Sequence, residues 1–190
     1  MFDLKIETAP EWVEAVLADF DRFLIDHAQA EKKASGMAMS MIAHYPDRKT
    51  LVRAMTDLAL EELIHFKQVM KLLSDRDLCL TADEKDPYVN GLRQCFRRGS
   101  DVFFLDRLLV AGVIEARGCE RFTLVAEALP EGKMKTFYDT IAKSEAKHHT
   151  LFIDLAHEYF DKQVVAQRLE EILAIEADIV ANLPHRAALH

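Results

Sequence analysis

Two copies of a Glu-x-x-His pattern are the residues of this sequence best placed to do chemistry. One copy runs from Glu62 to His65 within "EELIH", and the other from Glu145 to His148 within "EAKHH". Residues three apart share one face of a helix, so each pair can present a carboxylate and an imidazole to the same point. One such pair is a weak signal, but two on apolar helix faces are a strong one.

A lone glutamate precedes each pair by the length of a helical hairpin. Glu31 comes 31 residues before Glu62, and Glu115 comes 30 residues before Glu145. Each hairpin therefore supplies two carboxylates and one imidazole, a ligand set that suits iron or manganese better than a metal that prefers thiolates. Buried carboxylates are costly without cations to neutralise them. The sequence predicts a dinuclear metal site with the ligands Glu31, Glu62, His65, Glu115, Glu145 and His148.

Helical register selects these residues over their neighbours. Glu62 shares an apolar face with Met55 and Leu58, whereas Glu61 lies on a polar side. By the same periodicity, His148 is favoured over the adjacent His149. His27, one turn before Glu31, is open to two interpretations: it lines the site, or it is a structural core histidine.

The elements that must position these residues are helices with a four-three apolar spacing. We expect helices near 10–43, 47–74, 102–129 and 132–159, and a fifth near 161–183. The stretch 75–101 should be a long crossover connection that contains one short helix. The inventory is typical of an all-α, ferritin-like four-helix bundle with an additional C-terminal helix, which we expect to form one domain over residues 1–190.

Composition restricts the classes of function. The net charge is −8 and half of the residues are apolar, so general affinity for nucleic acid is not implied. The three cysteines show no spacing typical of a disulfide framework or a zinc site. We expect no signal peptide and no membrane span, because the most apolar stretch is interrupted by Asp106, Arg107 and Glu115. The expected location is cytoplasmic.

Four segments carry a resemblance to a known family: "DHAQAEKKAS", "LALEELIHF", "FLDRLLVAGVIEARGCERF" and "SEAKHHTLF". In this order and spacing they resemble the tRNA 2-methylthio-N(6)-isopentenyladenosine hydroxylase (MiaE) family, over roughly residues 8–160. The resemblance implies a non-haem di-iron monooxygenase that hydroxylates the isopentenyl group of this nucleoside, next to the anticodon. It also implies two iron ions as cofactor, O₂ as co-substrate, Glu62 and Glu145 as bridging ligands, and Glu31 and Glu115 as terminal ligands.

The implied partners are modified tRNA, through its anticodon loop, and an external electron donor such as a reductase and ferredoxin pair. Basic side chains that could hold phosphates form three groups: Arg93, Arg97 and Arg98; Arg107, Arg117 and Arg121; Lys143 and Lys147. The alternative for each of them is an ordinary solvated helix face. Small residues near Glu115, namely Ala111, Gly112 and Gly118, indicate either room for a substrate or close helix packing.

Two other functions share such a metal site. One is a ferritin-like ferroxidase or iron-storage protein, and the other is a manganese catalase-like protein. The ligand types alone do not separate iron from manganese.

Overall fold

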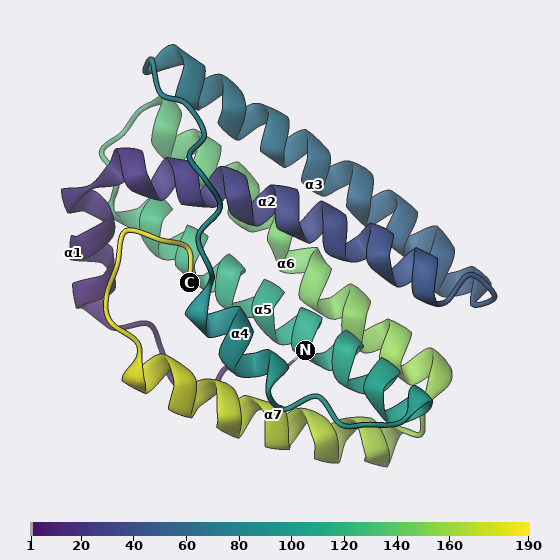
Figure 1. Cartoon of the computed structure of the whole chain (residues 1–190). Coiled ribbons are helices and arrows are strands. Elements are labelled where there is room, and N and C mark those ends of the chain that lie inside the picture. The colour runs from purple at the N-terminus through teal and green to yellow at the C-terminus, as the bar shows by residue number, and fades with distance from the viewer. Residues whose placement is uncertain (1) are drawn as a thin grey trace. The chain divides into compact units, whose positions relative to one another are not determined.

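The computed structural model describes residues 2–190, and all regular structure in this range is helical. The chain forms two compact units, one of residues 2–13, 85–185 and 190, the other of residues 14–84 and 186–189. The helices are α1 (Pro10–Ala18), α2 (Phe20–His44), α3 (Lys49–Asp75), α4 (Pro87–Arg93), α5 (Ser100–Ala128), α6 (Lys133–Tyr159) and α7 (Lys162–Asn182) (Figure 1).

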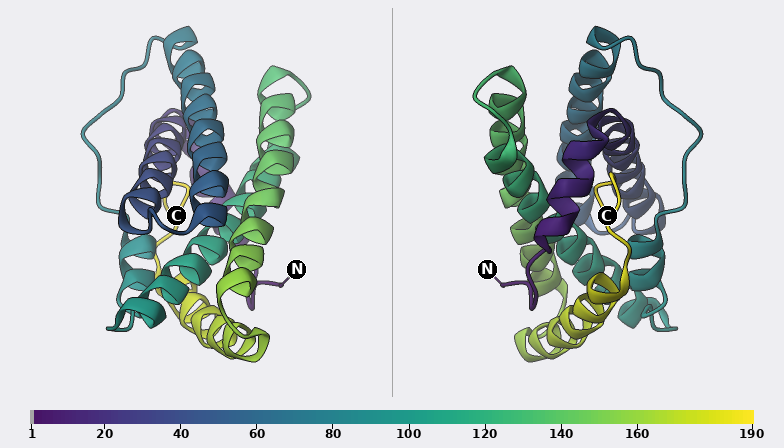
Figure 2. Two further views of the ribbon diagram at one scale, coloured as in Figure 1. Left: turned by 90° about the vertical axis from the view of Figure 1, so that its right-hand side faces the viewer. Right: turned by 90° about the vertical axis from the view of Figure 1, so that its left-hand side faces the viewer.

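The α2 and α3 helices form a long antiparallel hairpin (Figure 2). Its interior contains fully buried apolar side chains such as Leu24 and Met55. The sequence predicts one helix from residue 10 to residue 43, and this is wrong at one position. The Asp19 side chain accepts a hydrogen bond from the backbone N–H of Arg22 and caps the start of α2, which separates it from α1.

The α5 and α6 helices form the corresponding hairpin of the other unit (Figure 2). Gly112 of α5 allows the two helices to approach closely. A Cβ atom added there would lie 3.2 Å from Phe152 Cβ and 3.5 Å from the carbonyl oxygen of His149, both on α6. Of the two explanations for the small residues, close helix packing therefore applies at Gly112.

The predicted crossover connection over residues 75–101 begins with the non-helical segment 76–86. Three of its residues bind side chains of α2: the Thr81 carbonyl accepts from Gln29 at 2.8 Å, and Asp83 and Glu84 pair with Lys33 and Arg22. The connection then enters the short helix α4, where Pro87 occupies the first turn and Asp86 caps the helix through the N–H groups of Tyr88 and Val89.

A buried polar cluster joins α5, α7 and α4 within one unit. The guanidinium of Arg117 donates to both carboxylate oxygens of Glu176, at 2.8 and 3.1 Å, and Tyr88 donates to the same carboxylate at 3.0 Å. All three side chains are fully buried. Since each group is paired, the cluster avoids the penalty of an isolated buried charge and fixes how α7 lies on α5.

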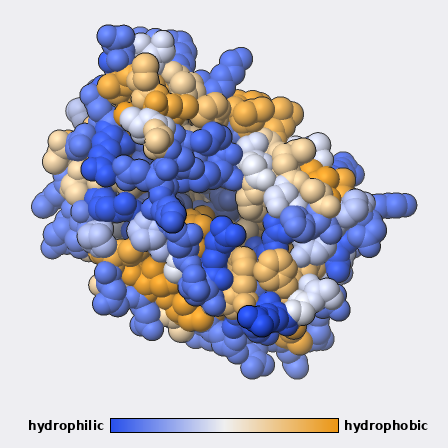
Figure 3. Space-filling view, in the orientation of Figure 1, coloured by the Kyte–Doolittle hydropathy of each residue, from blue (hydrophilic) through white to orange (hydrophobic). Residues whose placement is uncertain are grey.

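The surface turned to the viewer in Figure 3 is mostly hydrophilic, with apolar side chains in separate patches. Among residues 2–190, none of the helices has both the length and the apolar composition needed to cross a membrane.

Candidate metal centre

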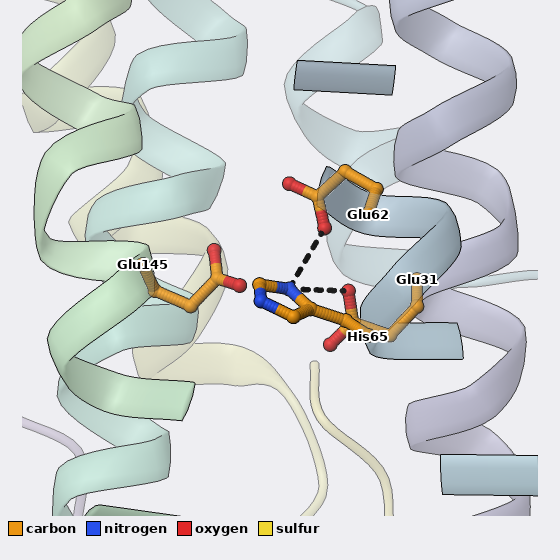
Figure 4. A group of neighbouring side chains, drawn as sticks. All are labelled: Glu31, Glu62, His65 and Glu145. Atoms are coloured by element: carbon orange, nitrogen blue, oxygen red, sulfur yellow. Dashed lines mark ion pairs between the residues drawn. The ribbon is translucent and has the colours of Figure 1, made fainter. Parts of the chain in front are cut away.

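The first group of predicted ligands lies in the α2–α3 hairpin (Figure 4). Glu31 of α2 and Glu62 and His65 of α3 have exposed fractions of 4%, 1% and 5%. The Nδ1 atom of His65 lies 3.5 Å from a Glu62 oxygen and 3.8 Å from a Glu31 oxygen. We call these three residues the N-terminal triad; each offers a ligand atom within 4.8 Å of the other two.

The second group lies in the α5–α6 hairpin. Glu115 of α5 and Glu145 and His148 of α6 are also buried. His148 Nδ1 lies 2.8 Å from a Glu145 oxygen and 3.7 Å from a Glu115 oxygen. These residues form the C-terminal triad, and in both triads it is Nδ1 of the histidine that faces the two carboxylates.

The spacing of these atoms fits metal ligation better than direct hydrogen bonding. At 3.5 to 3.8 Å, three of the four histidine–carboxylate separations are too long for a good hydrogen bond. Two ligand atoms of one ion, each bonded at about 2.0–2.2 Å, lie roughly 3–4 Å apart. Each triad offers oxygen and imidazole donors of the type that iron and manganese accept. The residues present in each unit therefore fit a metal ion.

His27 contacts Glu31 of the N-terminal triad. Its Nε2 atom lies 2.6 Å from Glu31 Oε1, and its ring is fully buried. Burial, with a smaller effect from His65, lowers the pKa of His27 from 6.5 to about 3. The ring is therefore neutral and donates its Nε2 proton to the carboxylate, an arrangement that orients a ligand and fixes the histidine tautomer. His27 is thus a fully buried core histidine that also contacts the predicted ligand Glu31, so features of both interpretations are present.

The structure also places the two rivals of the predicted ligands. The ring of His149 packs edge-on against Phe2, with 5.7 Å between ring centroids, whereas His148 faces Glu145 and Glu115. Glu61 is half-buried, in contrast to the fully buried Glu62.

The basic side chains that could hold phosphates fall into two classes, those paired with other residues of the protein and those exposed to solvent. Arg117 is fully buried in its pair with Glu176, and Arg121 is 4% exposed and lies over the ring of Trp12. Arg97 binds Asp106 through its backbone N–H at 2.8 Å and through its guanidinium. These arginines are structural. The exposed members of the three groups are Arg93, Arg98, Lys143 and Lys147.

Asp106 was not singled out from the sequence, although it organises the turn before α5. Besides Arg97, it accepts hydrogen bonds from Arg168 of α7 at 2.8 and 3.2 Å. Burial would raise the pKa of Asp106, but the hydrogen bonds from the two arginines outweigh it and lower the pKa. The available signal was an acid within the apolar run 103–114, where an unpaired carboxylate would be costly.

Comparison with known proteins decides the family. The chain matches the family described as tRNA-(MS[2]IO[6]A)-hydroxylase (MiaE) over residues 2–190. It is 37% identical to a tRNA 2-(methylsulfanyl)-N(6)-isopentenyladenosine(37) hydroxylase of Pseudomonas putida, over 98% of this chain and 91% of that protein. The chain belongs to the MiaE family. The expected enzyme class, a tRNA hydroxylase, is thereby confirmed.

Two further proteins are similar to this MiaE family member. A Salmonella typhimurium protein with the same name is 29% identical over 87% of this chain, which spans 60% of that protein. A solved structure from Synechococcus, named for aldehyde deformylating oxygenase activity, has a TM-score of 0.93 and 34% identity, covering 98% of this chain and 93% of that one. The all-α, ferritin-like fold class is confirmed.

Proposed function

We propose that this protein is an O₂-dependent di-iron monooxygenase that hydroxylates the isopentenyl group of 2-methylthio-N(6)-isopentenyladenosine in tRNA, next to the anticodon. The observation that carries the proposal is the pair of buried triads within a chain that matches the MiaE family over residues 2–190. The names of the curated relatives support the same substrate.

The proposed iron ligands are Glu31, Glu62, His65, Glu115, Glu145 and His148. Burial of all six side chains, and the convergence of donor atoms within each triad, support this assignment. Two iron ions would neutralise four carboxylates whose burial is otherwise unfavourable. The bridging role of Glu62 and Glu145 stays a prediction.

Bound iron would supply the activation of O₂, which protein side chains alone do not provide. The chain's own residues would prepare the site for that chemistry. The N–H of His27 holds the Glu31 carboxylate in one orientation. Buried apolar side chains one helical turn from the proposed ligands, such as Leu58 and Phe152, would help to keep water away from the site.

Space for a substrate group is supported at Gly118, one turn after Glu115. A Cβ atom added to this buried glycine would meet no described atom within 4 Å beyond its own chain neighbours and the adjacent backbone of α5. This open space supports the second explanation for the small residues, room beside a metal ligand. A modified base must leave the stacked anticodon loop to reach such a site, as enzymes that act on bases generally require.

Two further molecules must contact this protein, the tRNA substrate and an electron donor. Exposed Arg98, Lys143 and Lys147 would contact phosphates of the anticodon loop. The electrons would come from an external donor such as a reductase and ferredoxin pair. A reducing, cytoplasmic environment suits the three free cysteines and a tRNA substrate.

The test is mass spectrometry of nucleosides after incubation of isopentenylated tRNA with iron-loaded, chemically reduced protein and ¹⁸O₂. The expected result is one labelled oxygen atom on the isopentenyl group. A parallel reaction with a long-chain aldehyde examines the activity named for the Synechococcus relative. Deformylation of the aldehyde without tRNA hydroxylation, or rapid Fe(II) oxidation with mineral deposition, or peroxide dismutation with manganese, would each replace the proposal with the corresponding alternative.

A further inference from the structure

A row of exposed side chains on α3 has a distinct composition. It consists of Arg53, Leu60, Leu63, Ile64, Lys67 and Lys71, which we call the α3 outer stripe. The steps of three, four and seven residues place all six on one helix face, over about 27 Å of helix length. Its three apolar members have exposed fractions of 60%, 51% and 46% and lie close together, whereas other exposed large hydrophobic side chains, such as Met39 and Val164, lie singly on different helices.

The ends of the stripe are positively charged although the chain has a net charge of −8. Arg53 and Lys67 form no ion pair with any residue in the described part of the chain. Lys71 pairs with Asp75 at 2.7 Å, and Asp57 is the other exposed acid beside the stripe. An apolar centre between cationic ends is suited to a partner with an acidic rim around an apolar patch.

The opposite face of the same helix carries two of the proposed iron ligands. Ile64 is exposed, whereas the next residue, His65, is 5% exposed and faces Glu31 and Glu62. The path from the stripe to the N-terminal triad is therefore the thickness of one helix, about 10–12 Å with its side chains.

We propose that the α3 outer stripe is the docking surface for a small acidic one-electron carrier, an iron–sulfur protein of the ferredoxin class. This inference rests on the proposed monooxygenase function. The stripe's charge attracts an acidic carrier, its apolar centre gives a small and reversible contact of the kind typical of redox partners, and His65 lies directly behind it.

The electron balance requires such a carrier. Hydroxylation of a C–H bond places one oxygen atom of O₂ in the product and reduces the other to water, which consumes two electrons and two protons. A ferredoxin donates one electron at a time, so two reduced carriers are oxidised per turnover. Reversible, short-lived docking is suited to two successive visits.

Charge and composition argue against two other occupants. A second copy of this chain in a two-fold dimer would place cationic ends of the stripe against each other. Nucleic acid would leave Leu60, Leu63 and Ile64 without a partner, since phosphates dominate its contacts.

The experiment compares the iron-loaded wild-type protein with an R53E/K67E variant and with an L60S/L63S variant. The matched control is K133E/K162E, which changes the net charge equally through exposed residues of α6 and α7. The first measurement is calorimetric binding of oxidised plant-type [2Fe–2S] ferredoxin at low salt. The second is the rate at which reduced ferredoxin, or dithionite with methyl viologen, reduces the metal centre.

We expect both stripe variants to lose about tenfold or more in ferredoxin affinity and in ferredoxin-driven reduction, whereas the control variant retains both. Reduction by dithionite, tRNA affinity and dithionite-driven hydroxylation should remain at wild-type levels in all variants. If the wild-type protein does not hydroxylate tRNA with dithionite as reductant, the proposed function is contradicted. The ferredoxin-binding measurement still tests the docking proposal in that case.

Three results would overturn the docking proposal. The first is wild-type protein that does not bind ferredoxin, or stripe variants that bind it as well as the control does. The second is loss of tRNA binding on R53E/K67E substitution, which would make the stripe a nucleic-acid surface. The third is a wild-type dimer that L60S/L63S dissociates, which would make it an interface between copies.

Discussion

His27 shows how one side chain would prepare the proposed metal site without being a ligand. Its pKa of about 3 keeps the ring neutral at any physiological pH, so its Nε2 proton is always available to Glu31. A protonated ring would instead compete with a metal cation for the same carboxylate. The neutral ring therefore lets Glu31 keep its negative charge for the metal.

The ligand assignment predicts the iron content of histidine variants. His65→Ala and His148→Ala each remove the only imidazole of one triad and should lower the iron bound per chain, measured by plasma emission spectrometry. His149→Ala is the matched control, because its ring packs against Phe2, and it should retain iron. His27→Ala should weaken iron binding by about 10- to 100-fold through loss of its hydrogen bond to Glu31.

Thermal melts of the metal-free variants show whether each is folded. An iron-replete His148→Ala variant together with an iron-poor His149→Ala variant would show that the ligand has been assigned to the wrong histidine.

The arginines before α5 provide a second prediction for single residues. Arg97→Ala removes hydrogen bonds from the buried Asp106 and should lower the free energy of unfolding by about 1.5–3 kcal/mol. Arg98→Ala, at the exposed neighbour, should change stability by less than about 0.5 kcal/mol but weaken tRNA binding and reduce its salt dependence. Urea unfolding and filter binding at several salt concentrations measure the two effects. Equal tRNA affinity for Arg98→Ala and wild type would remove Arg98 from the proposed phosphate contacts.

At the scale of elements, two glycines on α5 have opposite surroundings. Gly112→Ala would press a Cβ atom against Phe152 of α6 and should destabilise the protein by about 1–3 kcal/mol. Gly118→Ala meets open space and should stabilise it by up to about 1 kcal/mol, because alanine favours the helix. Urea unfolding of both variants checks this contrast. If Gly118→Ala destabilised the protein as much as Gly112→Ala does, the space beside Gly118 would have to be filled in solution.

The helices that carry the triads were predictable from the sequence because their apolar spacing is regular. Glu62 and His65 interrupt a run that includes Met55, Leu58 and Val69, and the structure buries all five side chains. The break at Asp19 was not predicted, because the apolar face continues from Val16 to Phe23 on either side of it. One capping side chain, that of Asp19, begins the second helix, and the spacing of apolar residues contains no signal for such a cap.

Contacts distant in sequence explain the other differences. Arg117 reaches Glu176 across 59 residues, and Arg168 reaches Asp106 across 62. Helical periodicity places an arginine on a face, but it does not show whether an acid from another helix meets it there. The basic residues therefore appeared as surface groups in the sequence, and the structure assigns Arg117 and Arg121 to internal contacts.

At the scale of the whole molecule, the chain combines a net negative charge with a polyanionic substrate. Arg117 and Arg121 are buried, so we expect attraction to tRNA to depend on exposed cations such as Arg98, Lys143 and Lys147. A few phosphate contacts give only weak affinity for nucleic acid in general. We therefore expect selectivity for the modified nucleoside to depend on the fit of its side group near the proposed metal site more than on phosphate contacts.

The division of the proposed ligands into two triads also has a consequence for how the protein is made. Translation completes the N-terminal triad at His65, and the C-terminal triad only at His148, 83 residues later. At about 5–20 residues per second, the ribosome needs roughly 4–17 s for this interval. During that time the nascent chain already presents two carboxylates and an imidazole on one helical hairpin. We therefore expect that metal ions can bind in order, the first at the N-terminal triad while the second half of the protein is still being synthesised.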